Sequence, residues 1–325
     1  MDLRELVITL GVGIHELIKP EMMKPPSCSV AGEAASGDYT FTLDEIVETR
    51  LQELVAGVGK RAKRRLSFYS EDRGLVACAD DPQHVLIIDP IDGTRPAMCR
   101  FESSCISIAI APLNSPVVTL DDVDAAVLIE LKSGNILSAA RGGSVFYGSS
   151  PPASKHDQIN GSRLSQKTEL RHLFWGYETC ARPVEAVTGI LASLIDETSF
   201  GGGIFVFNSS SYAASRVVLG QLDAYVDPYA ALLRSNEGEH WKALSREKFC
   251  GKVMSLFPYD IAAAAFIAKQ AGAVVCDALG APIGDTNLLD SSENATLSCL
   301  VAGNRELGKT LISRLRKGFQ RVKIP

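Results

Sequence analysis

One ten-residue segment constrains the fold of this chain more than any other: residues 85–94, Val-Leu-Ile-Ile-Asp-Pro-Ile-Asp-Gly-Thr. Its first four residues are apolar and predict a buried strand that ends at Asp89. Pro90 disfavours a helical conformation at Asp89, so the chain stays extended or turns there. We therefore expect Asp89 and Asp92 to converge on one point at the end of this strand.

The residues after this strand have the composition of an anion site. Gly93 permits close backbone approach, and the amides of Gly93 and Thr94 point outward if a helical turn begins there. Two carboxylates beside such amides need a cation between them. The eight cysteines and five histidines are scattered, which argues against zinc, whereas hard oxygen ligands favour magnesium. The alternative, a simple Asp-Gly turn, leaves the second aspartate and the apolar strand unexplained.

Three further acidic residues strengthen this interpretation together rather than singly. Glu71 follows the strand-like run 66–70, and a carboxylate at a strand end can project over a crevice. Asp44 and Asp260 lie in the first turns of predicted helices, where an acid also favours the helix dipole.

The two halves of the chain have different patterns, and we expect a division into residues 1–150 and 151–325 near Pro151-Pro152. In the first half, helices are predicted over 3–18, ended by Pro20, and from a capping box at Thr42 through Val55. Strand-like runs then follow in series, which argues for an antiparallel sheet: 66–70, 85–89, 104–111, 123–131 and 136–140.

The second half alternates between strands and helices and predicts a sheet covered on both faces. Strands are expected at 172–177, 204–207, 222–227, 273–277 and 298–302, and helices at 183–196, 210–219, 260–271 and 304–317. Residues 229–258 lack clear periodicity and predict an inserted surface excursion, either a structured lid or a mobile loop.

Composition excludes several classes of protein. With 46% hydrophobic residues and a net charge of −5, the chain can form a packed core and lacks the basic excess of nucleic-acid binders. No apolar run reaches the roughly 18 residues of a membrane span. The absence of Cys-x-x-Cys pairs and of a secretory pattern predicts a cytoplasmic protein with reduced thiols. The basic run 60–65 is interpreted as a solvated face, with a partner-binding patch as the alternative.

These motifs resemble the inositol monophosphatase superfamily, which includes fructose-1,6-bisphosphatases and 3′-phosphoadenosine bisphosphate nucleotidases. The resemblance rests on residues 89–94, Glu71-Asp72, and the segments 220–227 (GQLDAYVD) and 259–263 (YDIAA). Residues 36–40 (SGDYT) and 43–46 (LDEI) are most similar to archaeal-type enzymes that accept both inositol phosphates and fructose bisphosphate. The resemblance implies an α/β (α+β) fold, a layered α/β/α/β/α sandwich with the site between its halves.

The resemblance also implies a phosphoric monoester hydrolase, a homodimer, that acts on a small phosphorylated polyol or sugar with two or three Mg²⁺ ions per site. It implies metal ligation by Glu71, Asp89, the Ile91 carbonyl, Asp92 and Asp260. Thr94 and Asp44 would orient and deprotonate the attacking water, and Glu71 counts among the catalytic residues. The substrate-binding residues would be Asp92, Gly93, Thr94, Ser210, Asp227 and Asp260.

Other functions stay open at this point. Fructose-1,6-bisphosphatase as the main activity is the first alternative, followed by a 3′(2′),5′-bisphosphate nucleotidase and by a non-catalytic binding protein. The last of these would be expected to lose a ligand, whereas every acidic position is retained here. Arg95-Pro96, Tyr259, Ala264 and the long connection from Asp227 to Asp260 depart from the family pattern and put the substrate in question. That connection could cap the substrate pocket, alter specificity or form a subunit interface.

Overall fold

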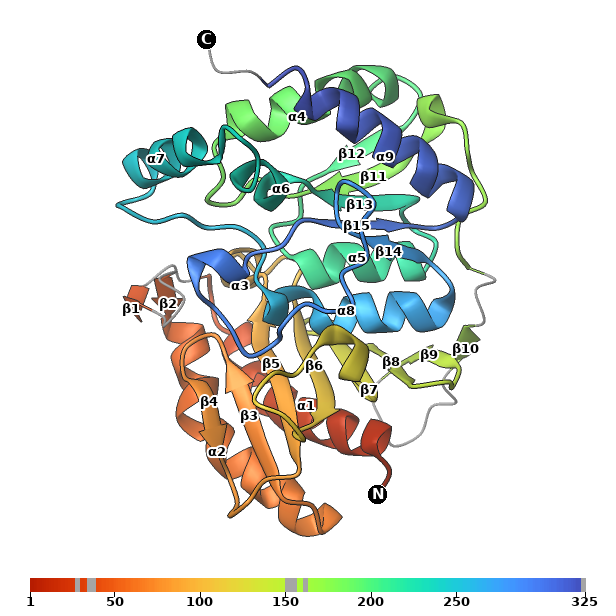
Figure 1. Ribbon diagram of the computed structural model, residues 1–325. Coiled ribbons are helices and arrows are strands. Elements are labelled where there is room, and N and C mark those ends of the chain that lie inside the picture. The colour runs from red at the N-terminus through yellow and green to blue at the C-terminus, as the bar shows by residue number, and fades with distance from the viewer. Residues whose placement is uncertain (27–29, 34–38, 150–156, 160–162, 323–325) are drawn as a thin grey trace.

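Five layers of secondary structure are stacked in the computed structural model, which describes residues 1–26, 30–33, 39–149, 157–159 and 163–322 (Figure 1). From bottom to top in Figure 1 they are a helix layer, a large sheet, a second helix layer, a smaller sheet and a third helix layer. This arrangement confirms the predicted α/β/α/β/α sandwich.

The large sheet contains eight strands. In spatial order they are β10 (Asp157–Ile159), β9 (Val145–Gly148), β8 (Ile136–Ala140), β7 (Ala125–Glu130), β6 (Cys105–Pro112), β5 (His84–Asp92), β3 (Leu66–Ser70) and β4 (Gly74–Ala77). A separate two-stranded ribbon is formed by β1 (Val30–Glu33) and β2 (Tyr39–Phe41).

The prediction of a wholly antiparallel first sheet was wrong at one pair, because β3 and β5 are parallel. After β3 the chain turns back as the edge strand β4, then crosses to the other side of β3 to begin β5. As a result Ser70 pairs with Ile88, so that the ends of β3 and β5 lie at the same edge of the sheet.

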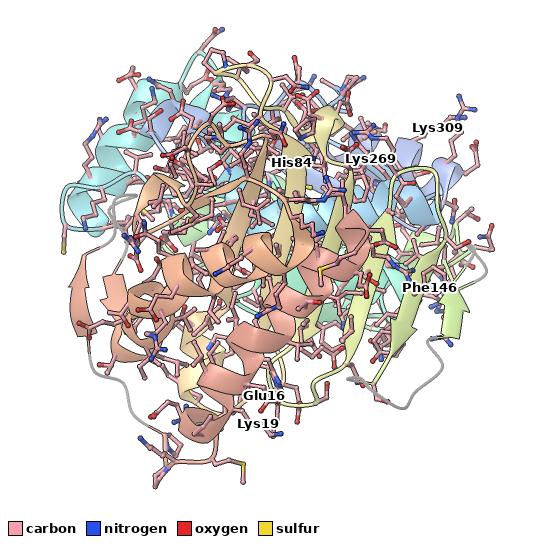
Figure 2. The ribbon with its side chains drawn as sticks, turned by 90° about the horizontal axis from the view of Figure 1, so that it is seen from below. Glu16, Lys19, His84, Phe146, Lys269 and Lys309 are labelled. Carbon is pink, nitrogen blue, oxygen red and sulfur yellow. The ribbon has the colours of Figure 1, made fainter. Side chains whose placement is uncertain are left out.

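The lower helix layer consists of α1 (Leu3–Met22) and α2 (Thr42–Ala62), which cross one face of the large sheet (Figure 2). Helix α1 buries Leu6, Leu10, Ile14 and Ile18 against this face. Pro20 lies inside its last turn rather than ending the helix, because near a helix end a proline removes only one hydrogen bond.

Helix α2 differs from its prediction at both ends. Its N-cap is Phe41 rather than Thr42, and the Asp44 carboxylate accepts a hydrogen bond from the Phe41 amide (3.0 Å). It continues to Ala62, so the basic run 60–65 begins in its last turn. None of the described helices combines the length and the hydropathy that crossing a bilayer requires.

The middle layer consists of α5 (Ser210–Val218) and α8 (Pro258–Ala271), which pack between the two sheets. The run Ile261–Ala268 of α8 is buried throughout. The smaller sheet has the strand order β12 (Gly203–Phe205), β11 (Phe174–Tyr177), β13 (Ala224–Asp227), β15 (Cys299–Ala302) and β14 (Val274–Cys276). Its outer face is covered by α4 (Val184–Thr198) and α9 (Arg305–Phe319), as the alternation predicted.

The segment 229–258 contains two helices and is buried at both of its ends, whereas most of the second helix is exposed. It contains α6 (Tyr229–Leu233), which is buried throughout, and α7 (Gly238–Lys248). The Tyr229 hydroxyl donates to the Trp241 carbonyl (3.2 Å), and Arg246 of α7 forms an ion pair with Glu293 (2.8 Å) in the 3-10 turn Glu293–Ala295. The expectation of a surface excursion was therefore wrong for α6.

Two further short segments connect the larger elements: the 3-10 turns Leu120–Asp122 and Leu170–His172. The division at residues 150 and 151 stays a prediction, since residues 150–156 lie outside the described chain. Strand β10, which follows that point, still belongs to the large sheet.

Candidate active site

The four predicted carboxylate ligands line one cavity between the two sheets. Glu71, Asp89, Asp92 and Asp260 all contribute to its wall, which encloses about 630 Å³ of space open to solvent. The structure therefore brings together acidic residues that are far apart in the sequence.

The topology of the large sheet places Glu71 beside Asp89. Because Ser70 of β3 is level with Ile88 of the parallel strand β5, the next residue of each strand emerges at the same edge. An antiparallel pair would have put Glu71 and Asp89 at opposite ends.

The end of β5 then positions the rest of the segment. Its pairing with β6 becomes irregular between Asp89 and Asp92, and Gly93 follows with φ of 88°. A Cβ on Gly93 would lie 2.7 Å from the Ser209 Cβ and 2.8 Å from the Ser103 carbonyl oxygen, so only glycine fits there. The short helix α3 (Thr94–Met98) begins at the next residue, which meets the condition under which the amides of Gly93 and Thr94 point outward.

Backbone donors orient three of these carboxylates. Asp92 Oδ2 accepts hydrogen bonds from the Ser209 hydroxyl (2.5 Å) and from the amide of Ser211 (2.7 Å) in the first turn of α5. Asp89 Oδ1 accepts from the Ile91 amide (3.0 Å), and Asp260 Oδ2 accepts from the Phe257 amide (2.8 Å) at the start of α8. Outer hydrogen bonds of this kind fix the direction in which a carboxylate presents its other oxygen.

Burial, and after it the repulsion between carboxylates, raises the pKa of Asp89, and burial raises that of Asp92. Burial, followed by the charges of Asp92, Asp260 and Glu71, holds the pKa of Asp89 well above its usual range. Burial also raises the pKa of Asp92 to about 6, against the lowering effect of its hydrogen bonds. Carboxylates that repel one another in a buried site are stabilised by a bound cation.

The residues present fit a hard divalent cation. The donors are carboxylate oxygens together with the Ile91 carbonyl, and the described part of the wall contributes no histidine. No three histidine, cysteine, aspartate or glutamate side chains in the described chain are already gathered tightly enough to hold an ion. The carboxylates would therefore have to draw closer as a cation binds, which the relief of their repulsion favours.

The predicted pair of Thr94 and Asp44 is also brought together. Thr94 Oγ1 lies 3.1 Å from Asp44 Oδ1 and 3.0 Å from the Ile91 carbonyl oxygen, and its proton can go to either acceptor. Asp44 is held in place at the start of α2 by the Phe41 amide. A hydroxyl that donates to a carboxylate keeps lone pairs with which it can accept a hydrogen bond from a water molecule.

Two predicted substrate-binding residues differ in their placement. Ser210 lines the cavity, and its hydroxyl accepts from Tyr225 (3.0 Å). Asp227 is fully buried at the end of β13 and accepts from Arg182 Nη2 (2.5 Å), so the structure does not bring it to the cavity wall. Residues 36–38 of the resembling stretch lie outside the described chain.

Sequence reasoning missed two charged residues of the wall, Glu178 and Arg182. Both follow β11, and Glu178 comes directly after this strand. The same rule that singled out Glu71, a carboxylate immediately after a predicted strand, would have found Glu178 at the end of the run 172–177.

Several known proteins are similar to this chain. The sequence model of the inositol monophosphatase family matches residues 8–318. The fructose-1,6-bisphosphatase/inositol-1-monophosphatase of Methanothermobacter thermautotrophicus is 24% identical over 292 residues, with 88% of each chain covered. The fructose-1,6-bisphosphatase of Pyrococcus furiosus is 22% identical over 315 residues, covering 96% of this chain and 97% of the relative.

Solved structures show the same fold. The Thermotoga maritima IMPase superimposes with a TM-score of 0.67 at 18% identity, covering 99% of this chain and 100% of that chain.

Proposed function

Since the chain belongs to the inositol monophosphatase family and is a phosphomonoester hydrolase, we propose that it hydrolyses inositol monophosphates or related sugar phosphates with the aid of Mg²⁺. The observation that carries this proposal is the gathering of Glu71, Asp89, Asp92 and Asp260 on one cavity wall. A phosphomonoester is close to a dianion at neutral pH and would be repelled by these carboxylates alone. Bound cations would reverse the sign of the site.

Each group of residues has a separate task in this proposal. When bound, Mg²⁺ supplies a polarised water and charge stabilisation for an in-line displacement. The ion would be held by Glu71, Asp89, the Ile91 carbonyl, Asp92 and Asp260. The amides of Gly93 and Thr94 bind phosphate oxygens at the start of α3.

The proton of the attacking water passes to Thr94 and Asp44. Thr94 Oγ1 accepts a hydrogen bond from the water while it donates to Asp44 Oδ1, 3.1 Å away. Asp44 is the base of this pair, and Thr94 sets the direction of the water.

A second candidate substrate is fructose 1,6-bisphosphate, which the names of the two archaeal relatives favour. Both activities need the same metal site and the same attacking water. They differ in the part of the substrate that remains after the phosphate is released, which the rest of the cavity must bind.

We also propose that the protein assembles as a homodimer. Apolar side chains are exposed on and beside the edge strand β12, among them Phe174, Phe205 and Val206. An exposed apolar edge strand favours association. Light scattering after size-exclusion chromatography is expected to give twice the chain mass of 34.9 kDa, and a monomer at all concentrations would contradict this proposal.

A phosphate-release screen tests the catalytic proposal. Inositol 1-phosphate, fructose 1,6-bisphosphate, 3′-phosphoadenosine 5′-phosphate and p-nitrophenyl phosphate are each incubated with Mg²⁺ and with EDTA. We expect release only with Mg²⁺, and a loss on the order of 10³-fold in Asp92→Asn. Equal activity of Asp92→Asn would show that the site is misplaced, and no release from any ester would refute the phosphatase assignment.

A further inference from the structure

Three buried charged side chains form a cluster on the side of the cavity that the small sheet contributes. Strands β11 and β13 are parallel, with Tyr177 level with Val226, so Glu178 and Asp227 emerge next to each other. Arg182 lies in the turn after β11 and pairs with Asp227 (2.5 Å). We call Glu178 and Arg182, which line the cavity, together with Asp227, which pairs with Arg182 but does not line it, the charged wall; all three are at most 5% exposed.

The contacts within the charged wall leave the hydrogen-bonding capacity of two of its polar groups unused among the described residues. Glu178 Oε1 accepts from the amides of Thr179 (2.7 Å) and Cys180 (2.9 Å), which leaves Oε2 as the remaining acceptor of a residue that lines the cavity. Arg182 Nη1 donates to the Cys180 carbonyl (2.5 Å) and Nη2 to Asp227, but Nε has no acceptor among the described residues.

The charged wall has no excess of positive charge. It contains one guanidinium and two carboxyl groups, and Arg182 is already paired with Asp227. A phosphate dianion is only an acceptor of hydrogen bonds and needs uncompensated cations or several donors. Beside Glu178 it would meet a carboxylate instead.

The other cation of the cavity wall lies on a different element. Arg95 belongs to α3, directly after the phosphate-binding turn, and its guanidinium is 5.5 Å from the centre of the Phe41 ring, next to α2. Its guanidinium therefore lies at Phe41, beside the start of α2, rather than on the charged wall.

A hydroxyl group matches what the charged wall offers, because it both donates and accepts. We propose that Glu178 and Arg182 bind hydroxyl groups of the leaving polyol, with one hydroxyl donating to Glu178 Oε2 and accepting from Arg182 Nε, and that this wall selects a hydroxylated monophosphate over a bisphosphate. Asp227 acts through Arg182 as a positioning residue. This inference rests on the proposed phosphatase function and extends it to the choice of substrate.

Neighbouring residues support the same ligand chemistry. Ser210 and Ser255 line the cavity, and the Ser255 hydroxyl has no hydrogen-bond partner among the described residues. Ser210 accepts from Tyr225, so its own proton can be donated to a substrate oxygen. Neutral hydroxyl groups around the Arg182–Asp227 ion pair favour the binding of a polyol over the binding of a second phosphate.

The test compares kcat/KM for inositol 1-phosphate, fructose 1,6-bisphosphate and p-nitrophenyl phosphate, in the wild type and in Glu178→Gln. Glutamine keeps an oxygen for the Thr179 and Cys180 amides but removes the negative charge. We expect the wild type to prefer inositol 1-phosphate to the bisphosphate by at least about tenfold. In Glu178→Gln we expect the ratio of kcat/KM for inositol 1-phosphate to kcat/KM for fructose 1,6-bisphosphate to fall by about tenfold or more. The main cause would be a higher KM for the monophosphate.

Glu185→Gln is the matched control. It removes the same charge seven positions along the chain, from an exposed residue in the first turn of α4. We expect it to leave all three kcat/KM values within about twofold of the wild type.

The possible failures are distinguishable. A wild-type preference for the bisphosphate would overturn the charged wall as a hydroxyl site, and this measurement needs no variant to fold. A folded Glu178→Gln whose substrate ratio stays within about twofold would overturn it as well. If not even p-nitrophenyl phosphate is hydrolysed with Mg²⁺, the phosphatase proposal itself fails, and the charged wall fails with it.

Discussion

Replacement of Asp92 by asparagine should stabilise the metal-free protein while it removes the response to Mg²⁺. Burial raises the pKa of Asp92 from an ordinary 3.8 to about 6 although three groups donate hydrogen bonds to its Oδ2. This difference corresponds to roughly 3 kcal/mol by which the ionised carboxylate destabilises the folded state. Asparagine keeps an oxygen for the Ser211 amide and carries no charge.

The size of this effect depends on pH in a defined way. Below about pH 4 the carboxyl is protonated in both states, so the charge contributes nothing. Between pH 4 and 6 the unfolded chain loses its proton first, and the wild type becomes progressively less stable than Asp92→Asn. Above pH 6 the whole difference is present, which for a chain of this length is a gain of roughly 4 °C in Tm.

Thermal unfolding by circular dichroism at pH 8, with EDTA and then with Mg²⁺, measures both parts of this prediction. In EDTA, Asp92→Asn is expected to melt above the wild type, whereas Mg²⁺ should raise the Tm of the wild type more. The matched control is Asp223→Asn, another buried aspartate, which pairs with Lys167 (3.2 Å) outside the cavity. It should lower Tm equally with and without Mg²⁺. The reasoning is refuted if Asp92→Asn is the less stable protein in EDTA, or if Mg²⁺ stabilises both proteins alike.

Three other substitutions test separate parts of the structure. Thr94→Ala should lower kcat by about 10²–10⁴-fold with little change in Tm, and Thr94→Ser should restore most of it; equal loss in both would exclude a role for the hydroxyl that contacts Asp44. Gly93→Ala should destabilise the protein by about 2 kcal/mol or more in urea unfolding, because this residue has a φ of 88° and its new Cβ would lie 2.7 Å from a neighbouring atom. The control is Gly74→Ala, also at positive φ but with no atom within 4 Å of the new Cβ, which should lose about 1 kcal/mol of stability. Burial raises the pKa of Glu48 to about 7. Glu48→Gln should therefore add about 3 kcal/mol of stability at pH 8 and less than about 1 kcal/mol at pH 5. Equal gains in stability at both pH values would contradict this pKa.

The sequence was sufficient to predict the parts of the site that depend on local geometry. An apolar run followed by Asp-Pro predicted that Asp89 would end a buried strand, and this strand is β5. The turn at Gly93 and the short helix after it follow from the same segment. These features depend on backbone preferences within a few residues.

Other parts depend on pairing between distant segments. The adjacency of Glu71 and Asp89 requires the parallel pairing of β3 with β5, which results from a crossover that no local pattern records. Whether a carboxylate at a strand end reaches the cavity is also a matter of tertiary packing: Glu178 does, while Asp227 is covered by Arg182.

Helix α6 shows a third reason for a wrong expectation. Its residues, Tyr229–Leu233, are buried on all sides. Such a helix has no polar face, and therefore none of the periodicity by which a surface helix is recognised. The same composition is compatible with an apolar loop, and only the packing around it distinguishes the two.

The central claim is that carboxylates from β5, the β3–β4 turn and α8 bind the same divalent cations. Anomalous diffraction from crystals grown with Mn²⁺ and inorganic phosphate locates these ions directly. We predict anomalous peaks within bonding distance of Asp89 and shared with Glu71, Asp92 or Asp260, and phosphate beside the amides of Gly93 and Thr94. Manganese bound only elsewhere on the molecule, with these four side chains in separate hydrogen bonds, would contradict the account.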